Sequence, residues 1–152
     1  MKRGLSRIES AILLASLLII ARIGASTHRW MWEETELAHY RATMQELTRT
    51  VRAMHSHALA GRRTIQLHID TSRGVFQLIS VQDKPAPYEI IERTIWLPEG
   101  LQVREAPEAL TALPTGRMSP TAIIIDAPSH NRLFRLTTTE AGLVQLNEES
   151  TL

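Results

Sequence analysis

The spacing of hydrophobic positions changes twice along the chain; the first two spacings predict parts of one long helix and the third predicts strands. The first part is an apolar run from 10 to 21, reading SAILLASLLIIA, which carries no charge. Apolar residues on both sides extend it to the roughly 20 residues that a membrane-spanning helix needs. Arg7, Glu9 and Arg22 interrupt the extended segment. We therefore expect residues 5–26 to form a helix that is partly transmembrane.

The second spacing is a heptad repeat on the same helix. Between Gly24 and Gly61 there is no glycine or proline, which is typical of an uninterrupted helix. Apolar side chains recur there in steps of three and four, at Leu37, Tyr40, Met44, Leu47, Val51, Met54 and Ala58. Such a narrow apolar stripe on an otherwise polar helix must be buried against another apolar surface. We expect residues 27–60 to be an amphipathic helix that packs on the chain's own head, and neighbouring helices are the alternative cover.

After Gly61 the apolar positions alternate with polar ones, which predicts a β-rich head over residues 61–152. We expect two hairpins, one joining 65–69 to 75–81 and one joining 133–138 to 143–147. Further strands are expected at 89–97, 101–105 and 121–126. Prolines predict loops at 84–87 and 106–120. The fold class is therefore α+β, with one long N-terminal helix followed by a β-sheet-rich, sandwich-like globular head.

Composition narrows the possible chemistry. The 17 basic and 16 acidic residues almost cancel, and cysteine is absent, which excludes disulfides and thiol catalysis. His55 and His57 are two residues apart and point to different sides of a helix, so they do not have metal-ligand spacing. Nucleophile elbows and phosphate-binding glycine loops are also missing. We expect no catalytic residue, metal or cofactor, and no enzyme activity.

The segment from Arg3 to Glu9, reading RGLSRIE and followed by the apolar run, resembles the amino-terminal signature of type IV prepilins and pseudopilins. The resemblance implies that residues 1–4 are a leader peptide, which prepilin peptidase removes after Gly4. Leu5 would then be the methylated first residue. Glu9 would be the retained carboxylate that meets the amino terminus of an adjacent subunit during filament assembly, since a carboxylate in hydrocarbon needs a partner.

A second resemblance covers the head. The blocks 60–70, 96–101 and 133–146 are similar to the H-type minor pseudopilins of type II secretion and to the related T-type minor pilins. It implies a minor subunit of a periplasmic pseudopilus, which begins as a single-pass bacterial inner-membrane protein with a cytoplasmic N-terminus and a periplasmic head. The implied partners are other major and minor pseudopilins or pilins, the prepilin peptidase and the inner-membrane assembly platform.

Two other functions remain open. One is a minor type IV pilin, which primes pilus assembly and in some relatives captures DNA; the other is a singly anchored periplasmic binding module. DNA capture needs clustered arginines, and the candidates are Arg62 with Arg63, and Arg132 with Arg135. However, residues 61–152 hold nine basic and eleven acidic side chains, so we do not expect a nucleic-acid partner. Neighbouring genes would separate a secretion subunit from a pilus subunit.

Overall fold

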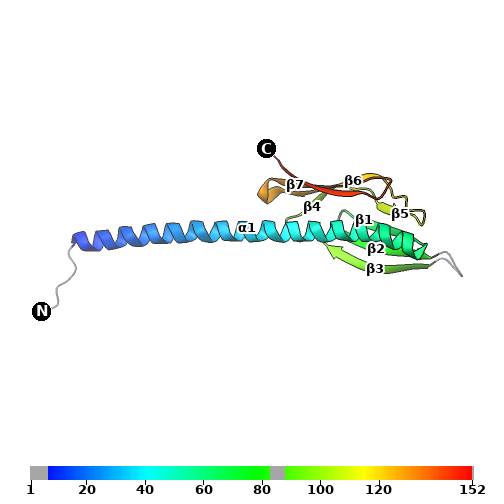
Figure 1. Cartoon of the computed structure of the whole chain (residues 1–152). Coiled ribbons are helices and arrows are strands. Elements are labelled where there is room, and N and C mark those ends of the chain that lie inside the picture. The colour runs from blue at the N-terminus through cyan, green and yellow to red at the C-terminus, as the bar shows by residue number, and fades with distance from the viewer. Residues whose placement is uncertain (1–6, 83–87, 152) are drawn as a thin grey trace. The chain divides into compact units, whose positions relative to one another are not determined.

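The computed structural model describes residues 7–82 and 88–151, and Figure 1 shows them as one long helix followed by strands. Helix α1 runs from Arg7 to Gly61. It ends there because Arg62 adopts a left-handed conformation, with φ of 48°. The expected long helix is thus confirmed. The predicted leader, residues 1–4, and the predicted loop at 84–87 lie outside the described residues.

The chain divides into two compact units, residues 1–38 and residues 39–152. The described part of the first unit, residues 7–38, is helical throughout. The second unit contains the remainder of α1 and all the strands that the structure describes. We call this second unit the head.

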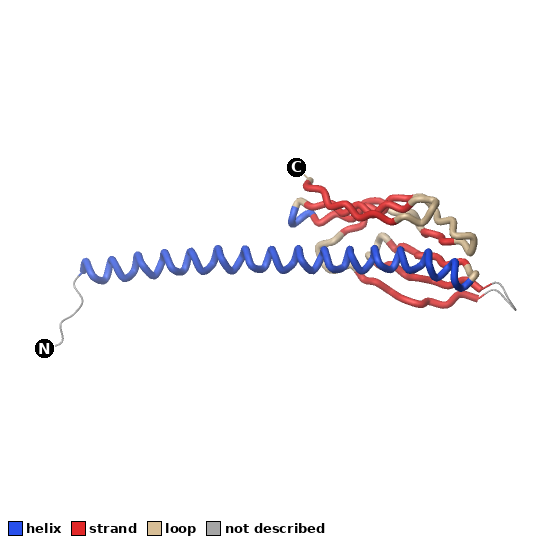
Figure 2. Tube along the Cα trace, viewed as in Figure 1, coloured by secondary structure: helices blue, strands red, loops and turns tan. Residues whose placement is uncertain are grey.

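Two four-stranded sheets, both antiparallel, make up the rest of the head. The first has the order β3-β2-β1-β5, with β1 at Thr64–Asp70, β2 at Val75–Gln82, β3 at Tyr88–Trp96 and β5 at Ala109–Ala112. The second has the order β4-β6-β7-β8, with β4 at Gln102–Glu105, β6 at Thr121–Ala127, β7 at Arg132–Thr138 and β8 at Val144–Ser150. A short 3-10 helix, Pro128–His130, joins β6 to β7. Figure 2 shows both sheets running beside the C-terminal half of α1.

Both predicted hairpins are present. Strands β1 and β2 pair with Leu67 opposite Leu78, and β7 and β8 pair with Leu136 opposite Leu146. The β1–β2 turn is held by Asp70, whose Oδ1 accepts hydrogen bonds from the backbone N–H groups of Ser72 and Arg73 at 3.0 and 3.1 Å. Aspartate and serine favour turns because their side chains bond nearby backbone groups, so the residues of this turn predict it locally.

The prediction of a continuous loop over residues 106–120 was wrong, because this segment contains β5. The strand pairs with β1 through Ile65 opposite Ala112 and Leu67 opposite Leu110. Leu110 and Ala112 are fully buried, so the segment is held by burial of alternate side chains against the core. Alanine and threonine next to prolines give little local strand signal, and the tertiary environment overrides it.

The heptad stripe of α1 supplies one side of the core of the head. Its members from Tyr40 to Ala58 are at most 1% exposed, and they lie among inward-facing strand residues such as Phe76 and Phe134. Two buried threonines of the helix satisfy their hydroxyls locally. Thr48 donates to the carbonyl of Met44 at 2.7 Å, and Thr43 donates to the carbonyl four residues before it at 3.2 Å. The helix can therefore bury these polar groups without partners from the sheets.

Candidate assembly surface and head contacts

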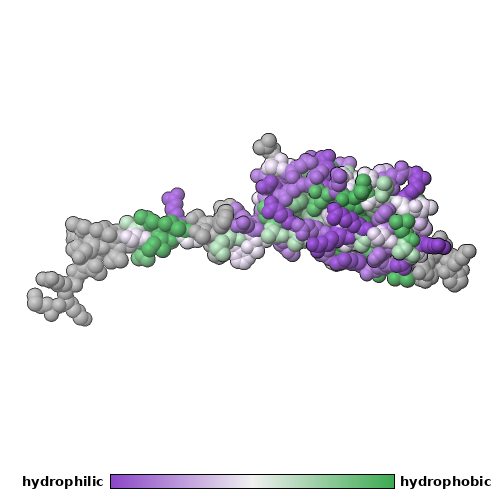
Figure 3. Space-filling view, in the orientation of Figure 1, coloured by the Kyte–Doolittle hydropathy of each residue, from purple (hydrophilic) through white to green (hydrophobic). Residues whose placement is uncertain are grey.

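The first unit presents apolar side chains on every side of its helix. Leu14, Leu17, Leu18, Ile19, Ile20 and Ile23 are each 60–66% exposed. At 100° per residue these positions are spread around the whole helix axis. Figure 3 shows a hydrophobic stretch on the helix, interrupted by a hydrophilic spot, and Arg22 is an exposed charge within residues 14–23. A helix that is apolar all round is normally buried in a large core, in an assembly or in a membrane. We call residues 14–23 the apolar band.

The predicted processing and assembly residues lie at the beginning of this unit. Gly4 and Leu5 are outside the described residues, so their roles remain predictions. Glu9 lies within the first turns of α1, on the same helix as the apolar band, and Arg7 is the first residue of that helix. The role of the Glu9 carboxylate also remains a prediction.

Within the residues that the structure describes, no helix has a segment that is both long enough and apolar enough to cross a membrane.

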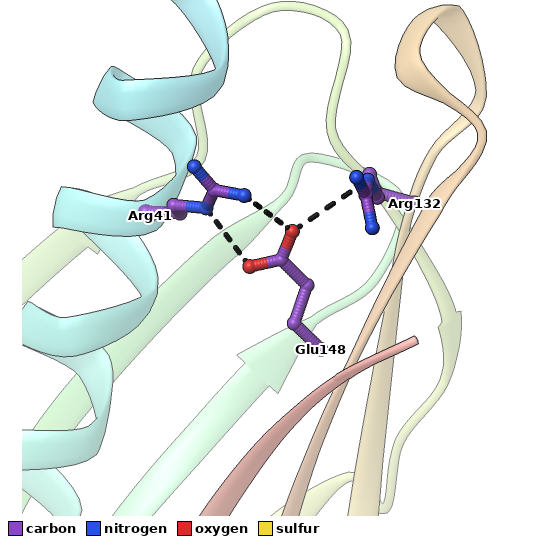
Figure 4. A network of polar contacts seen from close by, with 3 residues as sticks. All are labelled: Arg41, Arg132 and Glu148. Atoms are coloured by element: carbon purple, nitrogen blue, oxygen red, sulfur yellow. Dashed lines mark hydrogen bonds and ion pairs between the residues drawn. The ribbon is translucent and has the colours of Figure 1, made fainter. Parts of the chain in front are cut away.

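In the head, Glu148 joins the helix to the second sheet. Figure 4 shows its carboxylate on β8 pointing toward Arg41 of α1 and Arg132 of β7. Arg41 donates two hydrogen bonds to the two carboxylate oxygens, from Nε and Nη2, each at 2.9 Å. The Nε of Arg132 lies 3.6 Å from the same carboxylate. The bidentate hydrogen bonds from Arg41 and the charge of Arg132 hold the pKa of Glu148 below its usual range.

Other polar contacts fasten the helix to both sheets. On the first sheet, Arg93 of β3 donates to the Glu46 carboxylate at 2.6 Å and to the Thr50 hydroxyl at 3.4 Å. On the second, Arg52 donates to the carbonyl of Val144 at 3.1 Å. Residues 39–61 are thus bonded to both sheets, which holds the buried stripe of the helix against them.

His55 has a packing role at the C-terminal end of the helix. Its Nε2 lies 2.9 Å from the carbonyl oxygen of Gly116. Its ring also fills the space in front of Gly142, where a Cβ atom would come within 2.4 Å of it. Among the described residues, no group of three or more His, Asp or Glu side chains is arranged to hold a metal ion.

Three of the four arginines considered for DNA capture have carboxylate partners, and Arg62 makes no ion pair with the described residues. Arg63 pairs with Glu92 at 2.8 Å, Arg132 with Glu148 at 3.6 Å and Arg135 with Glu149 at 3.7 Å. These carboxylates neutralise the charges that would otherwise meet phosphates. None of these pairs was visible in the sequence, because the partners come from different strands and their charges follow no local pattern.

A long N-terminal helix followed by antiparallel sheets defines a pilin-like α+β fold, and comparison with solved structures agrees. A minor pseudopilin from the type 2 secretion system of Vibrio cholerae, EpsH, superposes with a TM-score of 0.60 at 18% identity, covering 71% of this chain and 95% of the solved EpsH chain. The type IV minor pilin FimU of Pseudomonas aeruginosa superposes with a TM-score of 0.59 at 19% identity, covering 74% of this chain and 91% of the solved FimU chain. No protein-family model and no curated protein sequence matches.

Proposed function

We propose that this chain is a minor pseudopilin, a structural subunit of the periplasmic pseudopilus of a type II secretion system. In this role it is a fibre component and has no catalytic activity. The chain is inserted in the bacterial inner membrane with its head in the periplasm, and prepilin peptidase cleaves it after Gly4. The processed helix, with methylated Leu5 at its start, then leaves the bilayer and joins other pseudopilins at the assembly platform.

The observation that carries this proposal is the contrast between the two units. The head buries its own core, whereas the apolar band exposes leucine and isoleucine on all sides of the helix. A side chain of this kind contributes about 1.5–3 kcal/mol when it is fully buried, so the band gains substantially from any hydrophobic environment. A membrane before assembly and a bundle of neighbouring helices afterwards both provide one. The pilin-like fold and the RGLSRIE segment support the same role.

The first experiment measures the intact mass of the full chain, extracted from membranes, with and without a co-expressed prepilin peptidase. We expect the peptidase to remove Met1–Gly4 and a methyl group to appear on Leu5. Gly4→Val should block the cleavage. Gly24→Val is the matched control, because a Cβ at Gly24 meets no atom within 4 Å and the change leaves the cleavage site intact. An uncut wild-type chain would refute the pseudopilin role and favour a singly anchored periplasmic module.

Glu9 is tested by assembly after cleavage. Glu9→Gln removes the charge that is proposed to meet the amino terminus of the adjacent subunit, but keeps the shape of the side chain. We expect the variant to be processed normally and to be lost from sheared fibre fractions. Glu33→Gln is the control for loss of one acidic residue from the same helix. Equal incorporation of Glu9→Gln and wild type would contradict the proposed role of the carboxylate.

A minor type IV pilin is the second candidate, because FimU superposes nearly as well as EpsH. The two candidates predict different partners. A minor pseudopilin should cross-link to pseudopilins and support export of secreted proteins, whereas a minor pilin should cross-link to pilins and support piliation. Deleting the gene and measuring both phenotypes in the same strain separates them. A loss of piliation with normal export would replace the first candidate with the second.

A further inference from the structure

The outer edge of strand β8 has backbone groups that no strand of the described chain uses. Strand β8 is at the end of the order β4-β6-β7-β8. The N–H of Thr139 donates to the carbonyl of Leu143 where the β7–β8 hairpin turns, and this bond sets the alternation of hydrogen bonds along the ladder. The backbone N–H and carbonyl groups of Val144, Leu146 and Glu148 therefore point away from β7, toward the open side of the sheet.

Helix α1 lies beside this edge, and one of its side chains already bonds to it. Nη2 of Arg52 donates to the carbonyl of Val144 at 3.1 Å, which places the helix flank next to the outward-facing backbone of β8. A cavity of about 380 Å³ lies here, and it is lined by Gln45, Thr48, Arg49 and Arg52 of α1 and by Leu146 of β8. The cavity is therefore bounded by the helix on one side and by the edge strand on the other.

The charges around this cavity favour an anion. Its two charged lining residues are both arginines, and its lining includes no acidic residue. Arg49 is exposed, and its guanidinium makes no ion pair with the described residues, while Arg52 bonds only to a neutral carbonyl there. Glu148 lies on the same face of β8, but Arg41 and Arg132 already neutralise its carboxylate (Figure 4). A carboxylate from outside would thus meet two guanidinium groups and no competing acid in the cavity.

An extended segment added to β8 would bring its side chains to these arginines. A new strand lies about 4.8 Å from β8, and its residue opposite Leu146 shares the same face of the sheet. Because the Leu146 side chain lines the cavity together with Arg49 and Arg52, the side chain of that residue would point into the same cavity. Residues 61–152 hold nine basic and eleven acidic side chains, so a peptide edge with one acidic side chain fits this site better than a nucleic acid.

We propose that the cavity between α1 and β8 binds an acidic, extended segment of a partner protein, which pairs with β8 through its backbone and places a carboxylate beside Arg49 and Arg52. The site goes beyond the fibre role, because all its residues belong to the head and none to the apolar band. Its test requires neither cleavage after Gly4 nor assembly. A failure of this test would leave the fibre role standing, and an uncut chain would still bind the segment.

The test uses the full chain in detergent micelles and two seven-residue peptides that differ only in the charge of the central side chain. The first is acetyl-Thr-Val-Thr-Glu-Thr-Val-Thr-amide, and the second has glutamine at the centre. Binding is followed by the backbone N–H signal of Leu146 in NMR spectra of leucine-labelled protein, assigned with the Leu146→Ile variant. We expect the glutamate peptide to shift this signal and to bind about fivefold more tightly than the glutamine peptide at low salt. Raising the salt concentration to about 0.5 M should reduce this preference.

Two matched variants locate the charge. Arg49→Gln should reduce the preference for glutamate to less than about twofold, since it removes one of the two guanidinium groups of the cavity. Arg104→Gln is the control, because Arg104 is an exposed arginine on β4, at the opposite edge of the same sheet, and its loss should leave the preference unchanged. Equal binding of both peptides, an unchanged preference in Arg49→Gln, or no shift of the Leu146 signal at several millimolar peptide would overturn the proposal. A shift produced by oligothymidylate but by neither peptide would also overturn it and assign the cavity to nucleic acid.

Discussion

Replacing Glu148 with glutamine should weaken the contact between the helix and the second sheet and change the shape of the head very little. Glu148→Gln removes the negative charge that receives two hydrogen bonds of 2.9 Å from Arg41 and that lies 3.6 Å from Arg132. Glutamine is nearly the same size, so packing around β8 is conserved. The variant therefore reports the charge-dependent part of the contact between α1 and β8.

The expected loss in the free energy of unfolding follows from the geometry of the contact and the exposure of its side chains. A hydrogen bond to a charged group contributes about 1.5–3 kcal/mol when it is buried, whereas an exposed ion pair contributes about 0.2–1 kcal/mol. The Glu148 side chain is 26% exposed and that of Arg41 is 46% exposed, so solvent screens part of the interaction. We expect Glu148→Gln to lower the free energy of unfolding by about 1–2 kcal/mol at neutral pH.

The assay is urea unfolding of the full chain in detergent micelles, followed by circular dichroism in the β-sheet region. Glu149→Gln is the control from the next position on β8. Its partner Arg135 is 3.7 Å away and both side chains are more than 40% exposed, so the expected loss is below about 0.5 kcal/mol. A double-mutant cycle with Arg41→Gln should give a coupling free energy of about 1 kcal/mol. Equal losses for the two glutamine variants, or no coupling with Arg41, would refute the reasoning.

The same contact predicts a pH dependence. Because the pKa of Glu148 is lower in the folded head than in the unfolded chain, its contribution to stability is complete above the usual glutamate pKa of about 4.3. The contribution is lost as the pH falls through the lower, folded-state pKa. The difference between wild type and Glu148→Gln should therefore disappear on acidification, and a difference that persists unchanged at pH 2 would contradict this linkage.

Three further substitutions and one control can be measured by the same unfolding assay. Met54→Ala empties a fully buried position in the helix stripe and should cost about 2–5 kcal/mol. Gly142→Ala should cost more than about 1 kcal/mol, because φ is 78° there and the new Cβ would come within 2.4 Å of the His55 ring, whereas Gly24→Ala should leave unfolding of the head unchanged. Ser80→Ala should be neutral or stabilising by about 1 kcal/mol, since the Ser80 hydroxyl is buried without a hydrogen-bond partner among the described residues.

The sequence predicted the elements whose signals are local. The absence of glycine and proline between Gly24 and Gly61 predicted the long helix, and its steps of three and four identified the stripe that is buried from Tyr40 to Ala58. Alternation and turn residues predicted both hairpins. These features depend on neighbours within a few residues, so one sequence is enough to show them.

Features that depend on distant partners were not predictable. Strand β5 exists because Leu110 and Ala112 are buried beside β1, more than 40 residues earlier in the chain. Arg41 and Glu148 are 107 residues apart, and neither lies in a motif. Propensity and periodicity carry no information about such pairings.

The head buries its apolar stripe and the apolar band exposes its side chains, and this difference bears on the proposed fibre role. The stripe on residues 40–58 is covered by the chain itself, and Arg52 and Arg93 bond the helix to the sheets, so its burial needs no partner protein. The apolar band has no such cover among the described residues, so its environment can be exchanged without unfolding the head. In the proposed role, the subunit moves from a bilayer to a helical bundle, and this separation would confine each change of burial to residues 14–23. Substitutions in the band should therefore alter assembly and leave the unfolding of the head unchanged, whereas Met54→Ala should do the reverse.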